Sequence, residues 1–184
     1  MNLTPAQLPL TTSMSSFAAF RASFKGDLLT PADAGYDAAI ARWAKNAARR
    51  AAVVALVKDA EDVSRAIIYA QQAKLPIAIR GGGHNAAGAS SSEGGLVIDL
   101  SRYLNGATID PENKLGYVGG GAVWETVDKA AIQHGLATVG GTVNHVSRLL
   151  ASPIDMILTH LRRLVWAGTW PECMHAMYTD ILID

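Results

Sequence analysis

The stretch Ile79-Arg80-Gly81-Gly82-Gly83-His84-Asn85-Ala86-Ala87-Gly88-Ala89-Ser90 decides how this sequence is interpreted. It is a glycine-rich loop with one histidine at its centre, and it follows a short apolar segment of strand length. Glycine has no Cβ, so backbone N–H groups in such a loop approach an anion closely and φ > 0 is accessible. Arg80 adds a positive charge at the entrance, and His84 supplies a nucleophilic ring nitrogen. The loop suits a diphosphate-bearing cofactor with a reactive ring. From these residues alone, a plain surface turn is the alternative interpretation.

Two better-known phosphate-binding loops do not match this stretch. A Walker A loop ends in Gly-Lys-Ser/Thr, whereas Gly88-Ala89-Ser90 has no lysine. The dinucleotide fingerprint G-x-G-x-x-G opens a helix, but residues 81–86 lack the third glycine and no amphipathic helix follows. A nicotinamide-dependent dehydrogenase is disfavoured, because no complete fingerprint is followed by an acidic residue ending a second strand roughly 20 residues on.

The segments before the loop predict a β-α-β unit. Residues 52–57 are a continuous apolar run, typical of a strand buried on both faces. Asp59 is a suitable N-cap with Asp62 three residues on, and apolar residues at helical spacing then continue to residue 74. Residues 77–79 form the next expected strand. Such crossovers are right-handed, so the glycine loop leaves the carboxyl end of a parallel strand, where ligands gather in α/β sheets.

Further elements are expected on both sides of this unit. Residues 15–24 predict a short helix, and the alanine-rich residues 38–50 fit either a helix or an extended segment, with Trp43 as an anchor. Residues 96–100 predict a third strand, and residues 108–110 and 115–118 a hairpin around a turn. A helix is expected over residues 123–134, ended by Gly135.

Composition narrows the class of protein. The 184 residues suit one domain or a domain with an appendage, and 49% hydrophobic with 17% charged residues is ordinary for a globular α/β protein. The net charge is zero and there is no basic run, which argues against a nucleic-acid partner. The single cysteine, Cys173, excludes an intrachain disulfide and a cysteine zinc cluster, and no metal site is expected.

The sequence offers no membrane or export signal. Residues 1–16 lack the basic start and the uninterrupted apolar run of a secretory signal. No stretch reaches the roughly 18 apolar residues that span a bilayer. We therefore expect a soluble, cytoplasmic protein without a membrane partner.

Four motifs, in their order and spacing, resemble one family. They are Arg-Gly-Gly-Gly-His-Asn at 80–85, Gly-Gly-Leu-Val-Ile-Asp-Leu-Ser at 94–101, Gly-Gly-Gly-Ala-Val-Trp at 119–124 and Gly-Gly-Thr-Val-Asn-His at 140–145. Together they resemble the FAD-dependent oxidoreductases of the vanillyl-alcohol oxidase and berberine-bridge type. The resemblance implies an α+β (α/β) fold, a PCMH-type FAD-binding domain of two small α/β subdomains. It implies an N-terminal extension over 1–35, a partial FAD-binding domain over 36–146 and a divergent tail over 147–184.

The resemblance also implies which residues meet FAD. The glycine loop would hold the pyrophosphate, and His84 would carry a covalent bond to the 8α-methyl carbon of the flavin. The implied cofactor-binding residues are Arg80, Gly81, Gly82, Gly83, His84, Asn85, Gly88, Ala89, Ser90, Gly140, Gly141, Thr142 and His145. Val143 stands near the position where relatives with a doubly attached flavin carry a cysteine for the second bond. At most one covalent bond to the flavin is therefore expected here. Trp124 is expected in the core.

The implied activity is a flavin-linked oxidation of a small molecule, an alcohol, a sugar or a secondary metabolite, with molecular oxygen as the acceptor. A substrate C–H would be delivered as hydride to the flavin, and the protein would position and tune the cofactor. No residue of this sequence is identified as the catalytic base. The alternative is a catalytically inactive, truncated FAD-binding fragment.

The resemblance stops at residue 146. Relatives continue with Gly-Val-Gly-Gly, whereas residues 147–153 read Ser-Arg-Leu-Leu-Ala-Ser-Pro. We expect a truncated chain that lacks the substrate domain and shows no steady oxidase turnover by itself. The tail is expected to be helical, since apolar residues recur at helical spacing at Ile154, Ile157, Leu158, Leu161, Leu164 and Val165.

Overall fold

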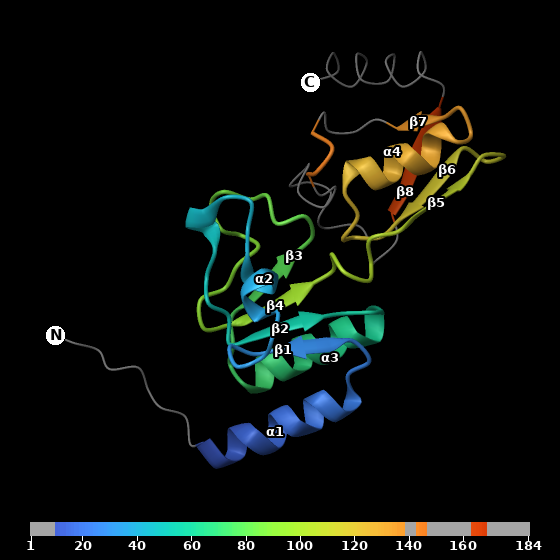
Figure 1. Cartoon of the computed structure of the whole chain (residues 1–184). Coiled ribbons are helices and arrows are strands. Elements are labelled where there is room, and N and C mark those ends of the chain that lie inside the picture. Colours follow the sequence, from blue (N-terminus) through green and yellow to red (C-terminus); the bar gives the residue numbers. More distant parts are fainter. Residues whose placement is uncertain (1–9, 139–142, 147–162, 169–184) are drawn as a thin grey trace, which may run out of the picture.

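The computed structural model describes residues 10–138, 143–146 and 163–168, which form two four-stranded sheets with helices packed against them (Figure 1). The first sheet has the order β1-β2-β4-β3, in which β2, β4 and β3 are parallel and β1 is antiparallel to β2. Its strands are β1 (Asp27–Leu29), β2 (Val53–Leu56), β3 (Ile77–Arg80) and β4 (Leu96–Asp99). The predicted β-α-β unit is confirmed, with β4 lying between the two strands that α3 (Ala60–Gln72) connects.

The start of α3 is tied to distant backbone by two aspartates. Asp59 is the N-cap, as expected, and its carboxylate accepts the N–H of Asp62 at 2.9 Å. Asp62 is fully buried. Its carboxylate accepts three backbone N–H groups, from Lys25 at 2.9 Å and from Gly26 and Lys58 at 3.0 Å. Asp62 therefore joins the helix start to the segment that leads into β1.

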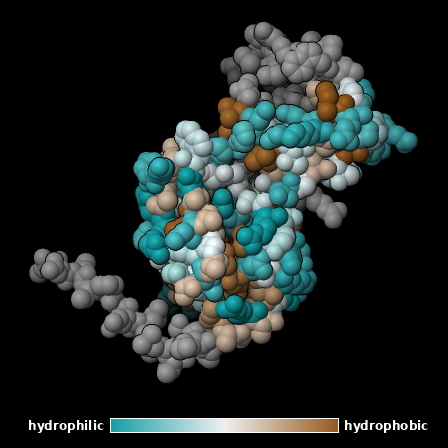
Figure 2. All heavy atoms as spheres, viewed as in Figure 1, coloured by the Kyte–Doolittle hydropathy of each residue, from teal (hydrophilic) through white to brown (hydrophobic). Residues whose placement is uncertain are grey.

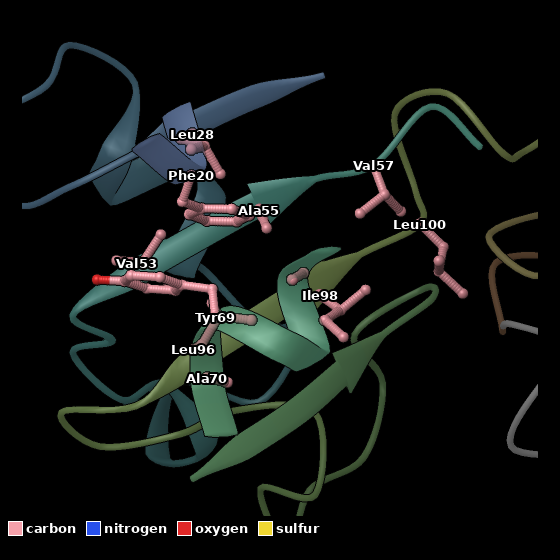
Figure 3. Packing of buried hydrophobic residues seen from close by; sticks show 11 residues of the cluster. Phe20, Leu28, Val53, Ala55, Val57, Tyr69, Ala70, Leu96, Ile98 and Leu100 are labelled. Carbon is pink, nitrogen blue, oxygen red and sulfur yellow. The ribbon is translucent and has the colours of Figure 1, made fainter. Parts of the chain in front are cut away.

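The main core lies between the first sheet and the helices α3 and α1 (Leu10–Ser23). Strand residues that alternate along β2 and β4 face it, because successive side chains point to opposite faces of a sheet. Phe20 of α1 stacks on Tyr69 of α3, with ring centroids 4.5 Å apart and planes 6° from parallel (Figure 3). On the other face, α2 (Tyr36–Ile40) packs against Val54, Ala78 and Val97.

The N-terminal segment contributes to this sheet. The helix expected over 15–24 is present as α1, and β1 is an edge strand of the sheet. The boundary predicted at residue 35 stays a prediction, but Phe20 and Leu28 of that segment belong to the core.

The alanine-rich residues 38–50 form neither a single helix nor a single extended segment. They begin in α2, continue through a 3-10 turn at Lys45–Ala47 and are otherwise irregular. Trp43, the expected anchor of this segment, does not lie in a core, since the side chain is 73% exposed. Its ring lies instead against the glycine loop, as described below.

The second sheet has the order β5-β6-β8-β7 and is antiparallel throughout. Its strands are β5 (Ala107–Asp110), β6 (Leu115–Val118), β7 (Ala137–Thr138) and β8 (Arg163–Gly168). The hairpin and the helix α4 (Trp124–Ile132) are as predicted, and Gly135 follows the helix with φ +66°. Trp124 is buried in the core, as expected.

The helix predicted for the tail is wrong at residues 163–168, which form the strand β8. Leu164 and Val165 lie in a strand that pairs with β6, because β6 offers an open antiparallel edge that local periodicity does not reveal. The other residues of the expected helix, 154–162, lie outside the described residues.

The passage between the two sheets requires glycine. A Cβ on Gly119 would lie 2.2 Å from the carbonyl oxygen of Leu104, and one on Gly121 would lie 2.1 Å from that of Leu100. The backbone after β6 therefore crosses the backbone after β4 at a separation that only glycine permits. The N–H of Gly121 donates to the carbonyl of Leu104 at 2.8 Å and holds this crossing.

The surface is mixed in character. Figure 2 shows polar and apolar side chains interspersed over the face in view. Ile77 and Ile79 of the edge strand β3 are among the exposed large hydrophobic residues. Within the described ranges, no helix has the length and apolar character that crossing a bilayer requires.

Asp62→Ala should lower the free energy of unfolding by about 3 kcal/mol, because three backbone N–H groups lose a charged acceptor inside the protein. Urea unfolding followed by circular dichroism measures the change. Asp37→Ala is the control, since that side chain is 89% exposed and its loss should cost about 0.5 kcal/mol or less. Equal costs for the two variants would contradict the role given to Asp62.

Candidate functional site

The glycine-rich loop connects β3 to β4 and begins at the carboxyl end of β3. Gly83 and Gly88 have φ of +73° and +89°, in the left-handed region that favours glycine. Positive φ is therefore required at these two positions and not at Gly82. His84 and Asn85 are half-buried, whereas Ala86, Ala87 and Ala89 are exposed.

The second half of the loop is a closed turn. The N–H groups of Gly88 and Ala89 donate to the backbone carbonyl and to the side-chain oxygen of Asn85, at 3.2 and 3.1 Å. The N–H of Ser91 donates to the carbonyl of Gly88 at 2.9 Å. Asn85 thus shapes the turn, and the N–H of Ala89 already has a partner.

The first half of the loop has the opposite character. The N–H groups of Gly82, Gly83, His84 and Asn85 donate to no other described residue. Successive backbone N–H groups in a turn bind anions when no protein group occupies them. These four groups are the part of the loop that is available to a phosphate.

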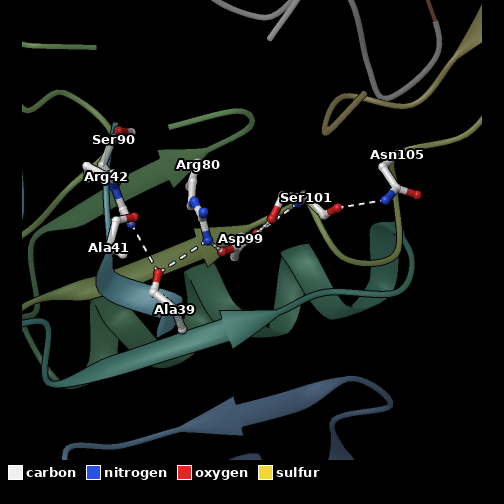
Figure 4. A network of polar contacts seen from close by, with 8 residues as sticks. All are labelled: Ala39, Ala41, Arg42, Arg80, Ser90, Asp99, Ser101 and Asn105. Atoms are coloured by element: carbon white, nitrogen blue, oxygen red, sulfur yellow. Dashed lines mark hydrogen bonds and ion pairs between the residues drawn. The ribbon is translucent and has the colours of Figure 1, made fainter. Parts of the chain in front are cut away.

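Arg80 lies beneath the loop and is held by a buried acid. Its Nη1 is 2.7 Å from Oδ2 of Asp99, which is fully buried at the end of β4 (Figure 4). The other oxygen of Asp99 accepts the N–H and the hydroxyl of Ser101, at 2.8 and 2.6 Å. A charged carboxylate in an apolar strand is stable there because it is paired with a cation and both of its oxygens accept hydrogen bonds.

A second guanidinium, that of Arg42, lies beside the first. Arg42 is 8% exposed, and its Nε and Nη2 donate to the carbonyl of Ser90 at 3.1 and 2.6 Å. Its Nη1 donates to the carbonyl of Ala39 at 3.1 Å, and Nη1 of Arg80 donates to the same carbonyl at 3.3 Å. Arg42 thereby ties the end of α2 to the far end of the glycine loop.

The charges under the loop do not balance. Arg42 forms no ion pair within the described part of the chain, so two guanidinium groups share the single carboxylate of Asp99. Burial, and next the positive charge of Arg80, lowers the pKa of Arg42 to about 10. Arg42 is still charged at neutral pH, so one net positive charge lies beneath the free N–H groups. Such a charge favours an anion at the loop.

Two further observations fit a bound anion. The side-chain oxygen of Ser90 and Nε of Arg80 are buried and have no hydrogen-bond partner among the described residues. Buried polar atoms are nearly always paired, so these two atoms leave hydrogen-bonding capacity for a ligand at the loop. We call residues 81–90, together with Arg42 beneath them, the cradle. A Cβ on Gly83 would lie 3.3 Å from both Cδ of Arg42 and Nε of Arg80, so the loop rests directly on the two arginines.

His84 stands at the centre of the cradle and is stacked on Trp43. The two ring centroids are 5.9 Å apart and the planes differ by 24°. The N–H of Trp43 also donates to the carbonyl of Gly83 at 3.3 Å. Both the backbone and the ring of Trp43 therefore contact the loop.

The second predicted loop is only partly described. Gly140, Gly141 and Thr142 lie outside the described residues, and His145 is exposed at the start of α4. There the N–H of Glu125 donates to the carbonyl of Asn144 at 3.0 Å. No hydrogen bond or ion pair between described residues joins His145 to the glycine loop. A contact of His145 with the cofactor stays a prediction.

Sequence reasoning missed Arg42, Trp43 and Asp99. Asp99 carries a recognisable signal, because an acid inside the apolar run 96–100 needs a buried cation. Arg42 and Trp43 carry none, since their importance depends on tertiary neighbours 48 and 41 residues away. In the described ranges, no group of three or more His, Cys, Asp or Glu side chains is arranged to hold a metal ion.

Comparison with known proteins places this loop in a family. A sequence family described as an FAD binding domain matches residues 51–147, more than half of the chain. (R)-6-hydroxynicotine oxidase of Paenarthrobacter nicotinovorans is 36% identical over 128 residues, which cover 70% of this chain and 28% of that protein. The FAD-linked oxidoreductase hasG of Aspergillus fumigatus is 33% identical over 138 residues, 73% of this chain and 29% of the relative.

Solved structures agree in fold. The crystal structure of 6-hydroxy-D-nicotine oxidase from Arthrobacter nicotinovorans superposes with a TM-score of 0.66 and 34% identity, over 68% of this chain and 27% of that chain. The wild-type BBE-like 1 protein of Physcomitrella patens gives a TM-score of 0.64 at 20% identity, over 71% and 29%, and so supports the fold alone. The chain spans little more than a quarter of these relatives' length. The predicted mixed α/β fold is confirmed, and the chain belongs to the family of FAD-binding domains found in FAD-linked oxidoreductases.

Proposed function

We propose that this chain is the FAD-binding portion of an FAD-dependent oxidoreductase and that residues 81–90 hold the FAD diphosphate. One observation carries the proposal: four consecutive N–H groups, from Gly82 to Asn85, have no partner among the described residues, and the loop that carries them rests on two guanidinium groups. Together with the carboxylate of Asp99, these two groups have one net positive charge. A diphosphate carries the complementary negative charge and accepts several hydrogen bonds at once.

Each residue of the loop has a distinct part in this proposal. Gly82, Gly83, His84 and Asn85 donate backbone N–H groups, and the hydroxyl of Ser90 is a further donor. Gly81 provides the turn out of β3, and Gly88 and Ala89 form the turn that closes the loop. Arg42 acts through its charge, because its Nε and both Nη atoms are already hydrogen-bonded to backbone carbonyls. Arg80 acts through its charge as well, and its Nε has no partner among the described residues. Gly140, Gly141, Thr142 and His145 are proposed to lie along the flavin.

We further propose His84 as the attachment point of a single covalent flavin link. It is the nucleophilic side chain at the centre of the cradle, and it is half-buried on a loop held by backbone contacts. A solved relative, the glucooligosaccharide oxidase from Acremonium strictum, is described with an 8α-N1-histidyl FAD; at 22% identity that likeness concerns the fold.

When bound, FAD would supply the redox chemistry of a substrate oxidation, with molecular oxygen as the proposed acceptor. In this proposal the whole protein oxidises a small molecule, an alcohol, a sugar or a secondary metabolite. The present residues bind and orient the cofactor, and no described residue is proposed as the base.

Gly83→Val should lower the affinity for FAD by at least about tenfold, a loss of ~1.4 kcal/mol. The side chain would be forced between the loop and the two arginines at a φ of +73°. Gly135→Val is the matched control, because Gly135 has a φ of +66° with open space around it and lies after α4. Fluorescence titration of the purified chain with FAD measures both. Equal affinity in Gly83→Val and the parent would rule out a diphosphate cradle here.

His84→Ala should release all flavin on acid precipitation, whereas the parent pellet should keep its yellow colour. Reversible binding should persist, since the backbone N–H groups of the loop are unchanged. His134→Ala, an exposed histidine after α4, is the control and should behave like the parent. If flavin stays with the His84→Ala pellet, the attachment point lies elsewhere.

A further inference from the structure

We infer that Trp43 is a positioning residue for His84, so that the indole holds the imidazole in the orientation that covalent flavin attachment needs. The inference rests on the proposed attachment at His84. Trp43 itself is assigned no contact with the reacting atoms.

The first observation is an exposed tryptophan whose ring lies against the imidazole. Trp43 is 73% exposed, although a large apolar side chain is normally buried where possible. Its ring faces His84 at 5.9 Å between centroids, within the range of about 4.5–7 Å over which aromatic pairs attract. Among the described residues, the aromatic ring in contact with the exposed indole of Trp43 is the imidazole of His84.

The second observation is that the same residue is fixed by its backbone. The N–H of Trp43 donates to the carbonyl of Gly83, directly before His84. The preceding residue, Arg42, donates two hydrogen bonds to the carbonyl of Ser90 at the other end of the loop. The dipeptide 42–43 therefore contacts the loop at Gly83 and at Ser90, and these contacts hold the backbone of Trp43 beside His84.

The consequence is a restricted imidazole. A free histidine side chain on a loop samples several rotamers, and a stacked neighbour removes those in which the two rings separate. Attachment replaces the N–H hydrogen of the imidazole and one C–H hydrogen of the 8α-methyl group by an N–C bond. Two protons go to solvent, and two electrons pass to the flavin and then to dissolved oxygen. Orienting the nitrogen before this step raises its rate without changing how tightly the diphosphate binds.

The experiment compares attachment rate with reversible affinity in the 184-residue chain. The parent, Trp43→Ala and Trp43→Phe are incubated with FAD in air, and acid-stable flavin is measured over time. The same Trp43 variants are made on the His84→Ala background, where only reversible FAD binding is titrated. We expect Trp43→Ala to slow attachment by about tenfold and Trp43→Phe to restore most of the rate, because an aromatic ring is what the stack requires. Reversible affinity should change by less than about twofold, since the cradle donors are untouched.

A measurement without FAD tests the stack itself. Diethyl pyrocarbonate labelling of the histidines, read by mass spectrometry of peptides, should be faster at His84 in Trp43→Ala than in the parent. The exposed His134 and His145 serve as internal references. Unchanged labelling of His84 overturns the inference.

The attachment assay has three other decisive outcomes. Equal attachment rates in the parent and in Trp43→Ala overturn the positioning role and leave the attachment at His84 intact. An equal loss of rate and of reversible affinity shows that Trp43 supports binding as a whole, which also overturns it. A parent chain that takes up no acid-stable flavin contradicts the proposed attachment, and the positioning role fails with it.

Discussion

The buried carboxylate of Asp99 is the interaction on which the candidate site depends. It ends a strand that is buried along its whole length, and it would be costly there without a cation. Arg80 supplies that cation from the neighbouring parallel strand, in register with Asp99. This pair fixes the carboxyl ends of β3 and β4 relative to each other. The glycine loop begins directly after Arg80, at the carboxyl end of β3, so the place where it starts is fixed by this contact.

Arg42 turns this pair into a support for an anion. Without Arg42, the ion pair of Arg80 and Asp99 would leave no net charge beneath the loop. Arg42 adds a charge that no described carboxylate offsets, and its hydrogen bonds go to backbone carbonyls at the end of α2 and in the loop. Excess charge inside a protein lowers its stability unless something compensates it. A bound diphosphate would provide that compensation, which links ligand binding to the stability of this part of the fold.

Much of the first sheet and of the loop could be predicted from local sequence. Apolar runs, the Asp59 cap and the glycine at residue 135 act over a few residues, and the elements they predict are present. The contact of Trp43 and the strand β8 could not be predicted from local sequence, for one shared reason. The position of each is decided by a partner distant in sequence, His84 for the ring and β6 for the strand. The charge of Arg80 was recognised, but its partner Asp99 could be assigned only once strand register was known.

The place of β8 in the second sheet has a consequence for the order of folding. Strands β6 and β7 contact each other only through β8, which lies between them. The first sheet has all its strands once residue 99 has been made, and its contacts are comparatively local. The second sheet has to wait for residues 163–168, so its closure carries a larger loop entropy. On the ribosome, the half that contains the glycine loop can therefore assemble while the other half is still an open hairpin and a helix.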